Sequence, residues 1–169
     1  MTTTLSARLQ LLLTHAFVST LDLSNPVDAA RIDLSADLAD GNAAGQANQV
    51  WHDRRTLIAA SELINLSGTG ANAKTNAFGE TVAFTTVKGL VIHNRTITAG
   101  ANLIVGNASA AFVTPFNAAS SRVNVYPGGL LMLFAPNTGY AVTGTTADDL
   151  KLDAGAATIE YDIYIIGTR

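Results

Sequence analysis

The last regular segment of the chain constrains the fold most. Between residues 159 and 166, one set of side chains alternates with another: Ile159, Tyr161, Ile163 and Ile165 against Glu160, Asp162, Tyr164 and Ile166. Successive side chains of a β-strand point to opposite faces, so this alternation predicts a strand with one buried face. Gly167 ends the run. Short runs of similar character, separated by Gly, Pro and Asn, recur through the second half of the chain.

These runs and the turns between them predict an all-β fold. Strands are expected at residues 63–66, 81–87, 89–93, 103–105, 123–126, 130–134 and 150–152. A β-bulge is expected at Lys88-Gly89, and Pro127-Gly128-Gly129 predicts a sharp turn. The spacing is typical of a sandwich or a jelly roll. We therefore predict a single jelly-roll-like β-sandwich domain that spans residues 1–169.

The N-terminal region also shows period-two patterns. Apolar residues alternate with mostly polar ones from Leu5 to Leu13 and again from Ala29 to Leu38, with an Asn25-Pro26 turn between them. The same leucines fit a helical spacing, so periodicity alone leaves both options open. The β-branched and aromatic residues that follow Leu13 favour a strand.

Residues 41–57 differ from the rest of the chain. They begin with small, polar residues from Gly41 to Gln46 and continue into the densest cluster of charge, beside the only tryptophan, Trp51. We interpret this stretch as a long excursion from the sheet, because functional contacts of β-scaffolds are often carried by such loops.

The composition restricts the possible partners. Charged residues make up 14% of the 169 residues, and the net charge is −3. The mean hydropathy of +0.26 is high for a soluble monomer, yet no apolar run approaches the length of a membrane span. The apolar excess therefore predicts a hydrophobic core and subunit contacts. Mild acidity argues against nucleic acid, and the absence of cysteine excludes disulfides and thiolate metal sites.

Several patterns approach a chemical motif without completing it. The stretch Gly68–Thr75 lacks the second glycine of a phosphate-binding loop, where Ala73 stands, and a strand is expected to follow it where that motif requires a helix. The three histidines, His15, His52 and His93, have no metal-ligand spacing. We predict no metal, nucleotide or other cofactor, although a site assembled from distant residues stays open.

Two pairs of carboxylates could serve acid–base chemistry. Asp148-Asp149 lie together in a predicted turn, and Glu160 and Asp162 lie on one face of the last strand, about 7 Å apart. Solvated surface charge explains both pairs more simply, because a catalytic acid needs an apolar pocket that the sequence does not indicate. We predict that the protein is not an enzyme.

Trp51, Arg54 and Arg55 combine the residue types most enriched at binding hot spots. They could form an interface, or Trp51 could anchor the long loop while the arginines pair with Asp40 or Asp53. The sequence favours neither option over the other.

Four segments resemble small structural proteins of tailed bacteriophages. They are residues 45–57, residues 78–90, the Pro127-Gly128-Gly129 turn and residues 161–167. The resemblance implies a virion protein with a jelly-roll fold that decorates the capsid as a cement protein. It implies no catalytic residue.

The resemblance and the composition together give the expected partners. The protein is expected to be assembled in the host cytoplasm, to bind the major capsid protein at the capsid surface, and to form a homotrimer, with neither nucleic acid nor membrane as a partner. The predicted contact residues lie in the long loop and at the N-terminus: Gln46, Asn48, Trp51, His52, Arg54 and Arg55, with Met1, Thr2, Thr3 and Thr4. Two alternatives remain, a carbohydrate-binding module of a tail or fibre and a carboxylate-dependent glycoside hydrolase.

Overall fold

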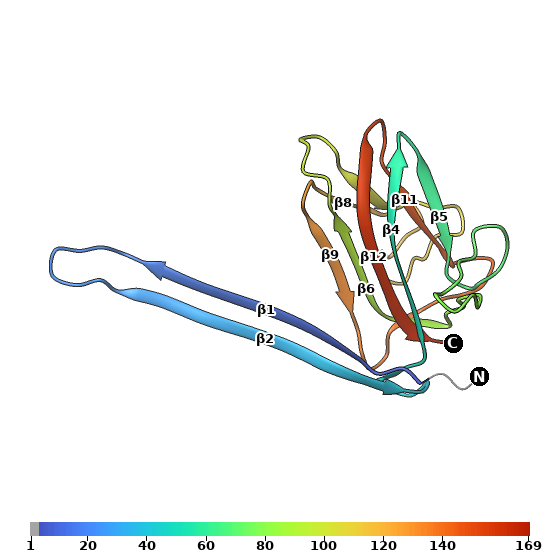
Figure 1. Cartoon of the computed structure of the whole chain (residues 1–169), viewed down its shortest axis with the longest axis horizontal. Coiled ribbons are helices and arrows are strands. Elements are labelled where there is room, and N and C mark those ends of the chain that lie inside the picture. Colours follow the sequence, from blue (N-terminus) through green and yellow to red (C-terminus); the bar gives the residue numbers. More distant parts are fainter. Residues whose placement is uncertain (1–3) are drawn as a thin grey trace.

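A computed structural model describes residues 4–169 of the chain. It shows a β-sandwich from which one long β-hairpin projects (Figure 1). The regular elements of residues 4–169 are all strands, so the all-β class predicted from sequence is confirmed. No helix in this part of the chain is long and apolar enough to cross a membrane.

The projecting hairpin, which we call the arm, consists of β1 (Ala7–Val18) and β2 (Val27–Asp40). The two strands are antiparallel and in register along their length, from Ala7 opposite Leu38 to Val18 opposite Val27. The turn at the tip is closed by a hydrogen bond from the Ser19 amide to the Pro26 carbonyl, 3.1 Å long. At the base, the short β3 (Gln46–Ala47) pairs in parallel with the end of β2.

The first sheet of the sandwich contains the last strand of the chain at its centre. β12 (Thr158–Thr168) lies between β4 (Gln49–Ile58) and β6 (Thr86–Asn94). The far edge of β6 pairs with β9 (Leu130–Phe134) and with β10 (Tyr140–Ala141). β4 is therefore one edge of this sheet, and β9 with β10 forms the other.

The second sheet has four strands in the order β5-β11-β7-β8. They are β5 (Ser61–Asn65), β11 (Asp149–Asp153), β7 (Leu103–Gly106) and β8 (Arg122–Val125). Neighbouring strands of this sheet are antiparallel.

The main core lies between the two sheets. It contains the predicted inward set of β12, which is fully buried, together with Leu103 and Leu152 from the second sheet. The opposite set of β12 faces outward, where Tyr164 is exposed and Glu160 and Asp162 are partly exposed. The alternation in the sequence therefore predicted correctly which side chains of this strand face the core. The exception is Ile166, which is buried beneath the base of the arm.

The bulge expected at Lys88-Gly89 is present. Gly89 lies opposite Ile166 and Val87 lies opposite Gly167, so Lys88 has no partner in the ladder with β12. The extra residue buries Lys88, whose Nζ donates a hydrogen bond to the Asn137 carbonyl. One strand, β6, thus begins at Thr86 where two strands, at 81–87 and 89–93, were expected.

The prediction of a long excursion at residues 41–57 is wrong. Only residues 41–45 form a turn, and residues 49–58 form strand β4 of the first sheet, paired along its length with β12. The excursion from the sandwich is the arm, at residues 7–40. The sequence obscures β4 because its inward face carries Asp53 and Arg55 between two apolar residues, which breaks the expected pattern.

Candidate functional site

The predicted contact residues of β4 separate onto two faces. Trp51 and Leu57 point into the core, and Asp53 and Arg55 lie on the same face between them, partly buried. Trp51 is only 5% exposed, so its ring offers almost no free surface to a partner and it serves as an internal anchor. Its role as an interface residue is not compatible with this position.

Arg55 belongs to a partly buried network between the sheets. Its Nε donates to Glu62 Oε1 at 2.8 Å, and its Nη1 donates to Asp53 Oδ2 at 2.9 Å. The Tyr161 hydroxyl also donates to Glu62, and burial with this carboxylate raises the pKa of Tyr161. These charges are satisfied within the fold, so Arg55 joins two sheets and is not available as a binding group.

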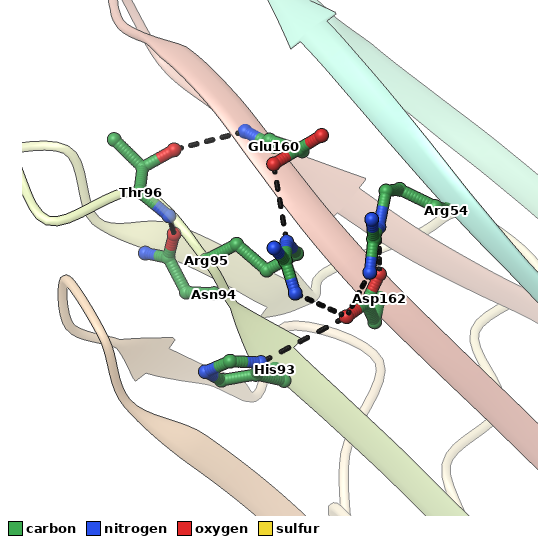
Figure 2. Close-up of polar contacts among 7 residues, drawn as sticks. All are labelled: Arg54, His93, Asn94, Arg95, Thr96, Glu160 and Asp162. Carbon is green, nitrogen blue, oxygen red and sulfur yellow. Dashed lines mark hydrogen bonds and ion pairs between the residues drawn. The ribbon is translucent and has the colours of Figure 1, made fainter.

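The outward face of the first sheet carries a second polar cluster, centred on Asp162 (Figure 2). Arg54 Nε donates to Asp162 Oδ1 at 2.6 Å, and Arg54 Nη2 donates to Oδ2 at 3.3 Å. Arg95 Nη1 donates to the same Oδ2 at 3.1 Å, while its Nε donates to Glu160 Oε2, also at 3.1 Å. His93 Nδ1 lies 3.9 Å from Asp162 Oδ2.

Backbone and amide contacts hold this cluster in place. Thr96 Oγ1 accepts a 2.9 Å hydrogen bond from the Glu160 amide, and the Thr96 amide donates to Asn94 Oδ1 at 3.1 Å (Figure 2). Asn94 is fully buried, and its Nδ2 donates to the carbonyls of Ala101 and Val125 at 2.8 and 3.0 Å. The residues on either side of Arg95 are therefore fixed, which positions its guanidinium between the two carboxylates.

The electrostatics of the cluster favour an ionised Asp162. The hydrogen bond from Arg54 is the main cause that holds the pKa of Asp162 below its usual range, and Arg95 acts in the same direction. A general acid needs a raised pKa, which burial away from cations would produce. Asp162 therefore lacks the raised pKa of a glycosidase acid.

An aromatic pair lies beside this cluster. The rings of His52 and Tyr164 are stacked, with centroids 4.8 Å apart and planes 14° from parallel. Tyr164 is 53% exposed, so the pair presents ring surface on the outward face of the sheet.

The free edge of β4 borders a groove that gathers several predicted residues. Its lining includes Thr4, Asn48, Trp51, His52 and the exposed Phe78. Of the predicted N-terminal contact residues, Thr4 thus lies beside the predicted contact residues Asn48 and His52. Met1, Thr2 and Thr3 lie outside the described residues.

Two further predicted residues have structural roles. Gln46 Oε1 accepts a hydrogen bond from the Ala43 amide at 2.9 Å and so closes the turn at the arm base. Asn48 joins that turn to the C-terminus, because its Nδ2 donates to Asn42 Oδ1 at 2.7 Å and its Oδ1 accepts from the Arg169 amide at 2.8 Å.

The structure does not assemble a metal site from the part of the chain that it describes. No three His, Asp or Glu side chains of residues 4–169 lie close enough together to hold an ion. His15 lies on the arm, whereas His52 and His93 lie on different strands of the first sheet. Asp148 is buried, and its Oδ2 accepts hydrogen bonds from Ser67, Asn65 and the Thr145 amide.

The feature that sequence reasoning missed is the apolar face of the arm. Residues directly opposite in an antiparallel pair share a face, so the register assigns alternate residues of both strands to one side. Its members are Ala7, Leu9, Leu11, Leu13, His15 and Phe17 of β1 with Asp28, Ala30, Ile32, Leu34, Ala36 and Leu38 of β2. The alternation from Leu5 to Leu13 and from Ala29 to Leu38 did signal these strands. It could not show that most of this face is exposed.

Comparisons of the chain with known protein families, with curated proteins and with solved structures find no match.

Proposed function

We propose that the protein is a non-enzymatic structural component of a phage particle, a decoration protein that binds and stabilises the assembled head. The arm is the observation that carries this proposal. It extends far from the sandwich (Figure 1), and beyond its base both strands are exposed. An isolated two-stranded hairpin is marginally stable in water, so an arm of this kind is suited to burial in an assembly.

The contacts of the outward polar cluster and of the inner network support a structural role. Both are closed sets of ion pairs in which each carboxylate faces an arginine, as Asp162 faces Arg54 and Glu62 faces Arg55. Such pairing fixes strands relative to one another. It holds the pKa of Asp162 below its usual range, whereas acid catalysis requires a raised one.

We also infer that the sandwich is a jelly roll. Counted from β4, its eight main strands divide into a sheet of the first, eighth, third and sixth strands and a sheet of the second, seventh, fourth and fifth. Successive strands thus change sheet except between the fourth and the fifth, and this order supports the two Greek keys of a jelly roll, an architecture that is common in viral capsid proteins. The fold supports the function only as an analogy.

Particle occupancy tests the proposed function. Purified phage particles should contain hundreds of copies by quantitative mass spectrometry, and particles that lack the protein should regain it when it is added. The recovered particles should resist heat better, because a ligand that binds only the assembled shell stabilises it. A dozen copies or fewer would place the protein in the tail and contradict the decoration role.

The stacked pair His52 and Tyr164 favours one second candidate, a carbohydrate-binding module of a tail or fibre. An exposed ring beside the Asp162 and Arg54 side chains provides both an apolar platform and hydrogen-bonding groups, which sugars require. Binding to a glycan array that is lost in Tyr164→Ala, with Tyr126→Ala as a control at another exposed tyrosine, would favour this candidate.

A further inference from the structure

We propose that the free edge of β4 binds an extended, arginine-bearing segment of a partner protein, which adds to the first sheet as a further strand. The segment lies in the groove that is lined by β4 and by residues 75–80. The inference goes beyond the proposed function, because it rests on the geometry of this edge and holds for any assembly that contains the protein.

β4 is the longest strand at an edge of the sandwich. It has ten residues, whereas the other edge strands, β5, β8, β9 and β10, have two to five residues each. Short edge strands offer few backbone groups to another chain, and a long edge is a template for strand pairing. The loop after β5 also bonds to that strand, since the Asn65 amide donates to the Asn72 carbonyl at 3.1 Å.

The register shows which backbone groups of β4 face away from β12. The Ala59 amide donates to the Ala157 carbonyl at 2.9 Å, and this pair continues the register of the two strands. Only alternate residues of an antiparallel strand bond to a given neighbour, so the odd-numbered residues of β4 bond to β12 and the even-numbered ones face outward. On the far side of β12, the Arg95 amide donates to the Glu160 carbonyl, so the even-numbered residues of β12 bond to β6, which agrees with this assignment.

One part of the outward edge is protected and another part is not. The Arg54 amide donates to Asp53 Oδ1 at 2.9 Å, so a side chain takes the place of a neighbouring strand there. The outward amides of Val50 and His52 have no hydrogen-bond partner among residues 4–169, and both residues line the groove. An extended peptide can satisfy these amides through main-chain hydrogen bonds, which supply the affinity when a strand is added to a sheet edge.

The groove is also lined by a tight turn at residues 76–80. Asn76 Oδ1 accepts hydrogen bonds from the amides of Phe78 and Glu80 at 2.9 and 3.0 Å, and the Asn76 amide donates to the Glu80 carbonyl at 2.9 Å. These bonds order the turn without a partner, which lowers the entropic cost of binding. The groove has a volume of about 420 Å³, within the range of ligand-binding pockets, so a few residues of a single strand fill it and a second sheet does not.

Charge and apolar surface in the groove indicate the side chain of the partner. Among the residues that the structure describes, the lining includes the carboxylates of Asp53 and Glu80 and no lysine or arginine. Asp53 is already paired with Arg55, whereas the exposed Glu80 receives only a 3.3 Å hydrogen bond from the side chain of Asn76. Phe78, two residues before Glu80, is 70% exposed. An arginine matches this pair, because its guanidinium binds a carboxylate and stacks on an aromatic ring.

Selection from a random library of heptapeptides on the immobilised wild-type protein tests the proposal. The enriched peptides should combine β-branched residues, which favour an extended strand, with an arginine. Binding of the strongest peptide should protect the amides of Val50 and His52 from hydrogen exchange. A selection that enriches no peptide, enriched peptides without arginine, or binding that leaves these two amides unprotected would overturn the proposal.

Proline variants test the edge within the protein, because proline lacks the amide proton and is tolerated on sheet edges. His52→Pro removes an outward amide inside the groove, and Thr56→Pro removes one outside it. His52→Pro should weaken the selected peptide about tenfold, and Thr56→Pro should bind it like the wild type. His52→Ala removes the ring but keeps the amide, so it should weaken binding less than His52→Pro. Circular dichroism checks that each variant is folded. Wild-type affinity in a folded His52→Pro would contradict strand addition.

Methylation of the peptide backbone tests the same contact without any change to the protein. Only alternate amides of an added strand face β4, so N-methylation should abolish binding at alternate positions of the peptide and be tolerated between them. If every position tolerated the methyl group, the peptide would not be bound as a strand.

Glu80→Gln tests the choice of arginine. The variant should bind the selected peptide about three- to fivefold more weakly, since an exposed ion pair is lost. A peptide with citrulline in place of arginine, which is neutral and of similar shape, should bind the wild type and Glu80→Gln equally. Equal binding of the arginine and citrulline peptides to the wild type would remove the ion pair from the proposal and so overturn it.

Discussion

Leu9 of the arm lies directly over Gly89 of the sandwich. A Cβ atom added at Gly89 would meet Leu9 Cδ2 at 3.0 Å and Ile166 Cγ2 at 2.9 Å. The absence of a side chain at this one position of β6 therefore lets the arm rest on the outward face of the first sheet. Since β6 is bulged at the neighbouring Lys88, the contact depends on a local irregularity of the strand.

Gly89→Ala is expected to loosen the arm base. The added methyl group must displace Leu9 and Ile166, and overpacking of this kind costs about 1–2 kcal/mol because flexible side-chain ends can move. Hydrogen exchange should accelerate at the Leu38 amide while amides of β12 stay protected. Equal acceleration in both places would show that the arm and the sandwich unfold as one unit.

Trp51→Ala is expected to destabilise the whole sandwich. The ring is buried in the main core, and truncation of a buried large aromatic costs about 3–5 kcal/mol. Urea denaturation measures the loss. Ile58→Ala on the same strand is the control. Ile58 is exposed, so its truncation should reduce the free energy of unfolding far less. Unchanged stability in Trp51→Ala would restore Trp51 as a candidate interface residue.

Asn94→Ala is expected to cost about 3 kcal/mol, because two buried carbonyls and the Thr96 amide lose their partner. Asn94→Asp should cost more, since a carboxylate cannot donate to the carbonyls of Ala101 and Val125. Thermal unfolding at neutral pH measures both. Asn102→Ala is a suitable control, because its side-chain Oδ1 has no hydrogen-bond partner among residues 4–169.

Asp148 is expected to make the free energy of unfolding decrease as the pH falls into the acid range. Burial raises the pKa of Asp148, but the hydrogen bonds from Ser67, Thr145 and Asn65 outweigh it, so the pKa is lower than usual in the folded state. A depressed pKa contributes stability above the unfolded value, about 3.9, and this contribution is lost as the pH falls through the folded value.

Asp148→Asn removes that titration. The difference in unfolding free energy between wild type and variant should be largest near pH 6 and shrink toward pH 3. Urea denaturation across this range measures the difference. Asp22→Asn, at the exposed tip of the arm, serves as the control for the substitution itself. A difference that stays constant with pH would mean that Asp148 affects stability through its packing and not through the charge of its carboxylate.

The sequence determined the strands whose burial alternates strictly. In β12 the pattern from Ile159 to Ile165 gave the correct faces, because each inward position is apolar. The β-bulge at Lys88-Gly89 was likewise predicted correctly from the sequence. β4 was missed because Asp53 and Arg55 face inward, where Glu62 of another strand neutralises the arginine. A single segment does not show such a partner.

Only the tertiary structure decided which surfaces are covered. The alternation around Leu9 and Leu13 predicted a strand with an apolar face, yet Leu9 packs on the sandwich while Leu13 remains 56% exposed. Local alternation specifies which side chains share a face. What covers that face depends on residues such as Gly89 and Ile166, more than 70 positions away along the chain.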